Sequence, residues 1–468
     1  MTSTLLLTTL LALSPPQWVP QTYSQPSTTS ASQPPWWTDA RFPGLGKLIE
    51  EALTNNGELS TARSQLAQAS ALKSQARSPL LPSLSADSSL SAAPTESLGF
   101  QLGGGMGAAA QASGGTLPDV YYTGATTIRG NYVVDLAGRN YLNYRAAKQN
   151  ESAAQFDVER GALTLAVQIT EAYLDIILAR EQLQIQKDLL RANQDFLDVI
   201  SLRFAKGEVS AVEVLQQKGQ VATAASQIPL AIASINNSQR RLGLWLGQPF
   251  ATPLSKSLIA LPTDGPDPDP GIPAGLLHHH PGLKSAAMRL LASSNAAKSA
   301  LRHHLPVLNL SGQVGKQYLY SNDLITQSFW GAGATLSLPL FSGFADQAAI
   351  EIAQAQAQGS RHTYEEMYRR AIMEVETTLT TFDATGSQLA EIEVALYNTQ
   401  KAYEKSRQRY LSGVGDYVST LTALQLYQQN KLNTLAVKRR RLSAEIQLRA
   451  AIGGAWTTGL GTTQRGKS

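Results

Sequence analysis

The sequence predicts a mixed α+β membrane protein in which each chain supplies four barrel strands and two long helical hairpins. Three features point to this fold class: an internal twofold repeat, a seven-residue apolar period in two long segments, and a two-residue alternation in the segments before them. Of the 468 residues, 43% are hydrophobic and 16% are charged. This composition is typical of a folded protein with a large core.

Two halves of the chain repeat the same order of motifs. LLPSLSA, which contains Pro82, corresponds to HLPVLNL, which contains Pro306. Further on, RFAKGEVSAVEVL (Arg203–Leu215) corresponds to RYLSGVGDYVSTL (Arg409–Leu421). Each half is therefore predicted to run helix, strand, loop, strand, long helix, glycine-containing tip and long helix. The predicted divisions are a signal-like N-terminal segment (1–33), a first repeat (34–250), a linker (251–275), a second repeat (276–456) and a flexible tail (457–468).

The first long helix of each half carries an apolar or aromatic residue at every seventh position. A period of seven that persists over this length predicts coiled-coil packing. Between Gly138 and Gly207 the first of these helices would extend about 100 Å, at roughly 1.5 Å per residue. The periodic positions are Ala162, Ile169, Ile176, Leu183, Leu190, Leu197 and Phe204 in the first half, and Tyr368, Val375, Phe382, Leu389, Leu396, Tyr403 and Tyr410 in the second.

The segments before the long helices alternate with a period of two. Leu308, Leu310 and Val314 alternate with polar or small residues, and the stretches around Ile128 and Leu336 do the same. One apolar and one polar face over about 10 residues is typical of a membrane barrel strand, although the alternation alone also fits a half-buried soluble sheet. Four strands cannot close a barrel, since small barrels have about eight. Three copies would supply a 12-stranded barrel, so we predict a homotrimer.

The composition also limits partners and compartment. A formal net charge of +4 on this length gives no reason to expect nucleic acid as a partner. The absence of cysteine excludes disulfides, thiolate metal sites, a cysteine nucleophile and a thioether lipid anchor. Leu5–Leu13 is long enough for the apolar part of a signal peptide, yet the first basic residue is Arg41. Either this signal is atypical or the assigned start is misplaced.

No residue pattern indicates catalysis, and we expect neither an enzyme nor a cofactor or metal site. The sequence holds no nucleophile with its base and no zinc motif. The histidines at 278–280 and 303–304 lack carboxylates at ligand spacing. The glycines at 103–105 and 107 lack the Lys-Ser/Thr of a phosphate loop, and we expect a loop between strands there. The basic run 438–441 is expected to be a solvated helix face, with a tunnel or adaptor contact as the alternative.

Four segments together resemble the TolC family of outer-membrane efflux proteins, in the NodT-like branch that serves resistance-nodulation-division (RND) pumps. They are the tryptophan-rich opening at 34–59, the linker at 271–283, LSLPLFSGF at 336–344 and the second tip at 409–425. The resemblance implies an outer-membrane barrel, surrounded by lipid, that continues as a helical coiled-coil tunnel through the periplasm. It also implies a periplasmic adaptor and an inner-membrane pump as partners. The branch is commonly lipidated on a cysteine, which this chain lacks.

The function implied by this resemblance is passive conduction of drugs, metals or other small toxic molecules to the exterior. Two alternatives stay open. Within the channel class, the chain would be the outer-membrane component of a type I secretion system, driven by an ABC transporter. From a different class, the long helices would belong to a soluble coiled-coil scaffold, which the alternating strands and the duplication disfavour.

The tips supply the residues that the resemblance assigns to adaptor docking. Glycine gives the backbone the freedom to reverse a helix, and both predicted tips contain one. In this family such tips meet matching tips of the adaptor. The expected adaptor contacts are Gly207, Glu208, Val209, Gly413 and Val414.

The resemblance also implies a gate at the start of the second return helix. Other members often carry Asp at the positions of Ser419 and Thr422, so their acidic ring is missing here. We expect Asp416 to supply the pore charge, and Tyr410, Ser419 and Thr422 to make the hydrogen bonds that hold the closed state. The alternative is that Asp416 is only the N-terminal cap of its helix.

Overall fold

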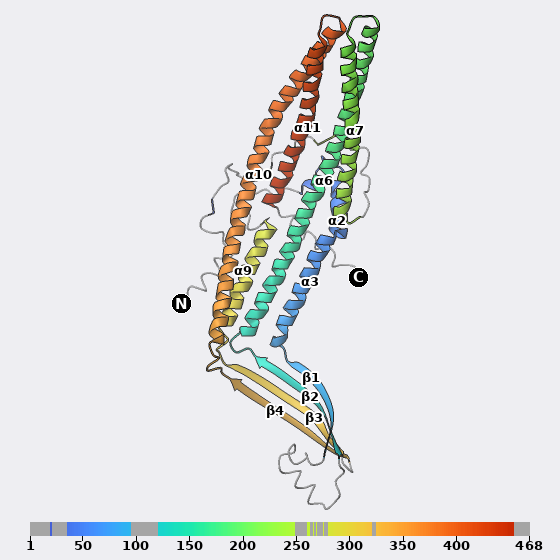
Figure 1. Cartoon of the computed structure of the whole chain (residues 1–468). Coiled ribbons are helices and arrows are strands. Elements are labelled where there is room, and N and C mark those ends of the chain that lie inside the picture. The colour runs from blue at the N-terminus through green and yellow to red at the C-terminus, as the bar shows by residue number, and fades with distance from the viewer. Residues whose placement is uncertain are drawn as a thin grey trace, which may run out of the picture. The chain divides into compact units, whose positions relative to one another are not determined.

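The computed structural model describes residues 19–20, 35–94, 120–248, 260–262, 265, 268, 275, 279–320 and 324–453 (Figure 1). The glycine-rich segment between the first two strands and the tail 457–468 lie outside the described residues. So do nearly all of the signal-like segment 1–33 and the linker 251–275.

The described elements follow the predicted order in both repeats. The two longest helices, α6 and α10, have 67 residues each, which corresponds to about 100 Å of helix. The first repeat contains η1 (Trp36–Thr38), α2 (Leu45–Asn55), α3 (Gly57–Arg77), η2 (Ser78–Leu80), β1 (Ser83–Pro94), β2 (Val120–Val134), α6 (Arg139–Ala205) and α7 (Ala211–Trp245). The second contains α9 (Pro281–Ala300), β3 (Val307–Tyr320), β4 (Leu324–Ser337), α10 (Ala345–Leu411) and α11 (Tyr417–Ile452).

The four strands form one antiparallel sheet in the order β1-β2-β3-β4 (Figure 1). Its register aligns the predicted apolar positions across the sheet. Ile128 lies opposite Val314, and Val314 lies opposite Trp330. Side chains directly opposite one another point to the same face. The period-two alternation is therefore confirmed in that the predicted apolar positions share one face, and β1 and β4 are the two edges of the sheet.

The chain folds into two compact units, and each takes segments from both repeats. The sheet unit contains residues 67–152 and 288–361, and the helical unit contains 1–66, 153–287 and 362–468. In the sheet unit, α9 is held along the beginning of α6. Asn295 donates to Gln149 Oε1 at 2.7 Å, and Ser299 Oγ donates to the carbonyl of Arg139 at 3.2 Å.

The core of the helical unit explains the tryptophan-rich opening. Trp36 is fully buried, and its indole N–H donates to Thr170 Oγ1 of α6 at 3.0 Å. The Tyr173 hydroxyl donates to the carbonyl of Pro43 at 3.2 Å, and burial raises the pKa of that phenol to about 12. Arg41 forms an ion pair with Glu445 of α11 at 2.8 Å. The N-terminal segment is thus fastened to both repeats by buried polar contacts.

The seven-residue period holds in the second repeat and fails at the end of the first. In α10, Tyr368, Val375, Phe382, Leu389 and Tyr410 are buried, as predicted. In α6 the buried positions include Ala162, Ile169 and Ile176, whereas Phe204 is 47% exposed. Toward the tip of α6 the burial shifts to Phe196 and Ile200. The prediction for Phe204 was therefore wrong, because a different helix face meets the second hairpin there.

One described helix, α6, contains a stretch that is apolar and long enough to cross a membrane. However, 67% of that stretch is buried inside the molecule. Burial against the other helices accounts for its composition, so we assign α6 to the helical core.

Candidate functional site

The first tip is closed by a glycine in the left-handed conformation. Gly207 has φ +78°, its N–H donates to Phe204 O at 2.9 Å, and the next N–H, of Glu208, donates to Arg203 O at 3.0 Å. This pair of bonds is a Schellman motif, which satisfies the carbonyls left over at a helix end. A Cβ on Gly207 would meet nothing within 4 Å. Backbone conformation, and not crowding, is what calls for glycine there.

The second tip repeats this turn at the fifth residue of the matching motif, as the first tip does. Gly413 has φ +77°, and its N–H donates to Tyr410 O at 3.0 Å. Val414 N–H donates to Arg409 O at 3.1 Å. The second tip differs from the first at Gly415. A Cβ on Gly415 would lie only 2.6 Å from the backbone nitrogen of Tyr410, so this position has no room for a side chain. The structure therefore places all five predicted adaptor residues in the two tips.

The predicted gate residues make local contacts within the single chain. Asp416 is the N-cap of α11, where its carboxylate accepts from the N–H of Ser419 at 3.0 Å and from its hydroxyl at 3.2 Å. Thr422 donates to Val418 O in its own helix at 2.9 Å. Asp416 therefore caps α11, as the alternative interpretation expected. It leaves the carboxylate charge in place, and the gate role stays a prediction.

Tyr410 lies in an aromatic cluster between the two hairpins. It is 2% exposed and packs edge-on against Phe196 of α6, with ring centroids 5.1 Å apart. Tyr417 stacks on the same Phe196 ring at 5.9 Å, and Ile200 completes the cluster. The Tyr410 hydroxyl is buried without a hydrogen-bond partner among the described residues. In one chain, Tyr410 therefore contributes packing and none of the predicted hydrogen bonds.

Arg203 ties the first tip to the second. Its guanidinium lies 4.9 Å from the centre of the Tyr410 ring and donates to Tyr410 O at 3.0 Å. The same side chain forms an ion pair with Glu208 at 3.0 Å. A cation at the carbonyl end of α10 is favourable because the helix dipole is negative there. The side-chain hydrogen bond of Glu208, opposed by some burial, raises the pKa of Arg203.

A buried polar chain connects the two hairpins behind the tips, from the start of α11 through α7 to α6. The Tyr417 hydroxyl donates to Gln217 Oε1 at 3.1 Å, and Gln217 Nε2 donates to Asn193 O at 2.9 Å. Asn193, Gln217 and Tyr417 are each at most 4% exposed. Burial raises the pKa of Tyr417 to about 12, so the phenol stays a neutral donor.

The sequence interpretation missed this chain, although a signal for it exists. Gln217 comes three residues after Val214, at the second apolar position of the heptad in α7. A polar side chain at such a position needs a partner inside the bundle. Tyr417 comes seven residues after Tyr410 and continues the aromatic line into the return helix.

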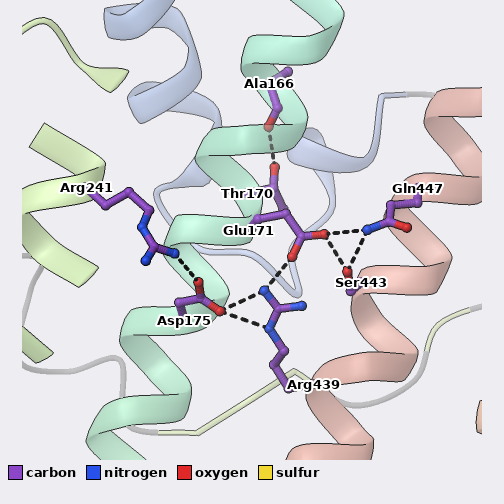
Figure 2. A network of polar contacts seen from close by, with 8 residues as sticks. All are labelled: Ala166, Thr170, Glu171, Asp175, Arg241, Arg439, Ser443 and Gln447. Atoms are coloured by element: carbon purple, nitrogen blue, oxygen red, sulfur yellow. Dashed lines mark hydrogen bonds and ion pairs between the residues drawn. The ribbon is translucent and has the colours of Figure 1, made fainter. Parts of the chain in front are cut away.

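A second polar network joins α6, α7 and α11 in the helical unit (Figure 2). Arg439 of α11 lies between Glu171 and Asp175 of α6, and its Nη2 is 2.7 Å from Asp175 Oδ1. Arg241 of α7 reaches the other Asp175 oxygen at 3.3 Å. Burial alone would lower the pKa of Arg439, but the two carboxylates outweigh it and raise that pKa. The interpretation of 438–441 as a solvated face is therefore wrong for Arg439.

The histidine segments do not form a metal site among the described residues. His280 is half-buried, and its Nδ1 accepts from the N–H of Leu283 at 3.2 Å. Burial, together with the charge of Arg160, lowers the pKa of His280 to about 4. The described part of the chain contains no group of three His, Cys, Asp or Glu side chains that could hold a metal ion. His278 lies outside the described residues.

Comparison with known proteins decides the family. Residues 48–248 and 272–454 match the family model described as outer membrane efflux protein. The chain belongs to the outer membrane efflux protein family. This efflux protein is 26% identical over 424 residues to the pyoverdine export outer membrane protein OpmQ of Pseudomonas aeruginosa, which covers 90% of this chain and 87% of OpmQ. It is 26% identical to the toluene efflux pump outer membrane protein TtgF of Pseudomonas putida, over 92% of this chain and 88% of TtgF.

Solved structures share the fold of this efflux protein. The CmeC outer membrane channel of Campylobacter jejuni superposes with a TM-score of 0.78 at 20% identity, covering 94% of this chain and 91% of CmeC. The open state of the MtrE outer membrane channel of Neisseria gonorrhoeae gives 0.77 at 20% identity, covering 94% and 96%. The predicted family, outer-membrane location and efflux-channel function are confirmed, and the family is one of transport channels.

Proposed function

We propose that three copies of this efflux protein close a 12-stranded barrel in the outer membrane, and that their helical hairpins continue it as a duct. The observation that carries the proposal is the open sheet, in which β1 and β4 are edges. Unpaired backbone N–H and C=O groups cannot face hydrocarbon. Pairing of β4 of one copy with β1 of the next removes both edges, and three copies close the ring.

The two faces of the sheet suit lipid outside and water inside. Most side chains on one face are apolar and exposed, and a single polar row crosses it at Ser88, Thr126, Lys316 and Ser328. On the other, Asp87 and Arg129 lie 4.0 Å apart, beside Asn131 and Gln313. A barrel strand alternates in this way when its lumen is aqueous. The large exposed side chains of the apolar face are Leu84, Leu90, Ile128, Leu310, Val314, Trp330 and Leu336.

Cysteine cross-linking tests the barrel cleanly, because the chain has no cysteine of its own. Each variant carries two cysteines at polar-face positions, one on each edge strand, so that a disulfide would link β4 of one copy to β1 of the next. Suitable variants combine Ser89→Cys on β1 with Gly331→Cys or Gly333→Cys on β4. We expect at least one pair to give a covalent trimer in isolated outer membranes. The matched control pairs Ser89→Cys with Gln317→Cys, an exposed polar-face position on β3, which is no neighbour of β1 in the sheet. A monomer in every pairing would contradict the barrel.

We propose that the two tips dock on a periplasmic adaptor. Both tips leave apolar side chains uncovered in the single chain, and uncovered apolar clusters are typical of interaction sites. Gly207, Glu208, Val209, Gly413 and Val414 shape or belong to this surface. The exposed apolar side chains around them are Leu202, Phe204, Val212, Leu215, Leu411, Val414 and Val418.

Substitution of the exposed tip side chains separates docking from folding. Val212→Asp and Val418→Asp place a charge on the uncovered surface without touching the tip glycines. We expect both variants to reach the outer membrane as trimers and to lose adaptor cross-linking and export. Leu230→Asp, on an exposed position of α7 away from the tip, is the control. Normal export by both tip variants would exclude docking there.

For the gate, we propose that Asp416 supplies a ring of three charges while Tyr410, Ser419 and Thr422 support the closed tip. The Tyr417–Gln217 bond supports this proposal, since it holds the start of α11 against the first hairpin. A closed state held by few buried bonds can be opened by a partner that competes for the same helices. Single-channel recording of Tyr417→Phe should show a raised open probability, and an unchanged one would exclude this latch.

We propose that the cargo is a class of small toxic or exported molecules and that the energy comes from an RND pump, with an ABC transporter as the other pump type. The names of the relatives support small solutes: pyoverdine export for OpmQ, toluene efflux for TtgF and cation efflux for CusC of Escherichia coli. Deletion of the gene should raise sensitivity to solvents or metals, and cross-linked adaptor and pump should co-purify with the channel. Loss of a secreted protein instead would favour the ABC system.

A further inference from the structure

Cationic side chains gather in the helical parts of the sheet unit, next to the ends of the strands. The turns and helices at 67–82, 135–152, 288–306 and 338–361 contain nine Lys or Arg and only four Asp or Glu, although the whole chain has a net charge of just +4. Such an asymmetry indicates an anionic partner for this region. The basic residues are Lys73, Arg77, Arg139, Arg145, Lys148, Arg289, Lys298, Arg302 and Arg361.

The nearest acidic groups already have partners. Asp135 caps the start of α6, where its carboxylate accepts from the N–H groups of Asn140 at 3.1 Å and Tyr141 at 2.8 Å. Glu151 forms an ion pair with Lys73 at 2.6 Å. Among the described residues, no carboxylate lies within ion-pair distance of Arg139, Arg145, Lys148 or Arg302.

The cations converge from two neighbouring helices of the sheet unit. The bonds of α9 to Gln149 and to Arg139 bracket a short stretch in which Arg145 of α6 and Lys298 of α9 lie at the same level. Arg302 extends the group toward the strands, and its Nη1 donates to the carbonyl of Ala137. Burial, and then the like charges of Arg145 and Arg302, lower the pKa of Lys298. An anion bound here would relieve this repulsion.

An aromatic and apolar border precedes the cations along the chain. Leu136, just after β2, and Tyr141 are 60% and 52% exposed. Tyr141, Arg145 and Lys148 follow at spacings of four and three, so they form one exposed stripe of α6. The order from strand to apolar residue, aromatic residue and cation is that of side chains at a lipid–water boundary.

We propose that Arg145, Lys148, Lys298 and Arg302 bind the phosphate of anionic phospholipids in the periplasmic leaflet of the outer membrane. The proposal rests on the barrel proposed above, because the barrel puts the strand ends at that leaflet. Lys and Arg near an anionic membrane each strengthen attraction about fivefold, so three of them change affinity on the order of 100-fold. The lipid contact would help to hold the channel at a fixed depth in the membrane.

The test uses the purified full-length protein in detergent. Phosphatidylglycerol and phosphatidylcholine are titrated separately, and retained lipid is counted by native mass spectrometry at low and high salt. We expect the unaltered protein to prefer phosphatidylglycerol, and R145Q/K148Q/K298Q to lose that preference by on the order of 100-fold. The charge-matched control R240Q/K405Q/R407Q neutralises exposed cations outside the cluster and should keep the preference. Inorganic phosphate at millimolar concentration should not displace the lipid.

Several results would overturn the proposal. These are an unchanged preference in the triple variant, an equal loss in the control, or displacement of the lipid by inorganic phosphate. A shift in anion selectivity with lipid retention intact would place the cations in the duct and overturn it too. The charge-conserving variant R145K/K298R should behave as the unaltered protein, which separates lipid binding from misfolding. If the barrel itself is wrong, the unaltered protein retains neither lipid, whereas failure of this site alone leaves both retained without preference.

Discussion

The two hairpin tips share one backbone turn and differ in what covers them. Gly207 and Gly413 have φ values one degree apart and close the same pair of hydrogen bonds. However, Phe204 in the first tip is 47% exposed, while Tyr410 at the equivalent position of the second is 2% exposed. Local sequence thus sets the turn, and the neighbouring hairpin decides the burial. In the single chain the ring of Tyr410 is therefore covered by the first hairpin, whereas the ring of Phe204 is not.

The largest expected effect comes from truncating this equivalent pair. Tyr410→Ala should destabilise the second tip by about 3 kcal/mol, because it empties a buried aromatic cluster. Phe204→Ala should cost less than about 1 kcal/mol, because half of that ring is in solvent. Hydrogen exchange of residues 405–421, followed by mass spectrometry, measures both. Equal loss of protection in the two variants would remove the distinction between the tips.

The polar chain behind the tips should be the next most sensitive feature. Gln217→Leu leaves the Tyr417 hydroxyl and Asn193 without their partner in a buried site, at a cost of roughly 1–3 kcal/mol. Adding Tyr417→Phe removes one of the stranded groups, so the double variant should be less destabilised than the sum of the single ones. The same hydrogen-exchange measurement, arranged as a double-mutant cycle, gives the coupling. Simple additivity would mean that the bond at 3.1 Å contributes little.

Replacing either tip glycine should lower the free energy of unfolding by about the same amount in both tips, and by less than the loss of the buried polar chain. Gly207→Ala and Gly413→Ala force a side chain into the left-handed region, at about 1–2 kcal/mol each. Gly219→Ala is the matched control, since Gly219 lies inside α7 with nothing within 4 Å of a new Cβ. There alanine should stabilise the helix by up to about 1 kcal/mol. The melting temperatures of the three variants measure these effects. A shift in the same direction in all three would contradict a special requirement for glycine at the tips.

The smallest stability effect is expected at Asp416, where charge and cap can be separated. Asn caps a helix about as well as Asp, so Asp416→Asn should change stability by less than about 0.5 kcal/mol. If Asp416 forms the proposed ring of three charges in the pore, the same variant should lower the preference for cations in planar bilayers. Asp416→Ala, which loses the cap as well, should cost about 1 kcal/mol more. Unchanged selectivity in Asp416→Asn would leave Asp416 as a cap only.

Much of the fold follows from patterns that are local in the sequence. Glycine in the left-handed region and a capping residue three positions later, Ser210 or Asp416, are sufficient to define each tip. The alternation around Ile128 and Val314 was enough to predict two faces of a sheet, because side chains of a strand point alternately to either side. These features depend on neighbours along the chain and can therefore be predicted without the tertiary structure.

The tertiary structure decided which of two equivalent helix faces is covered. The heptad predicts the same packing for Phe204 and Tyr410, yet only Tyr410 packs against Phe196. Likewise, nothing local in the sequence pairs Gln217 with Tyr417, which lie 200 residues apart. A period specifies that a face is apolar but not what packs on it, since that depends on contacts between segments distant in sequence. The sequence by itself therefore determined the elements, the turns and the family, and the packing of the hairpins determined that Tyr410 is buried and Phe204 is exposed.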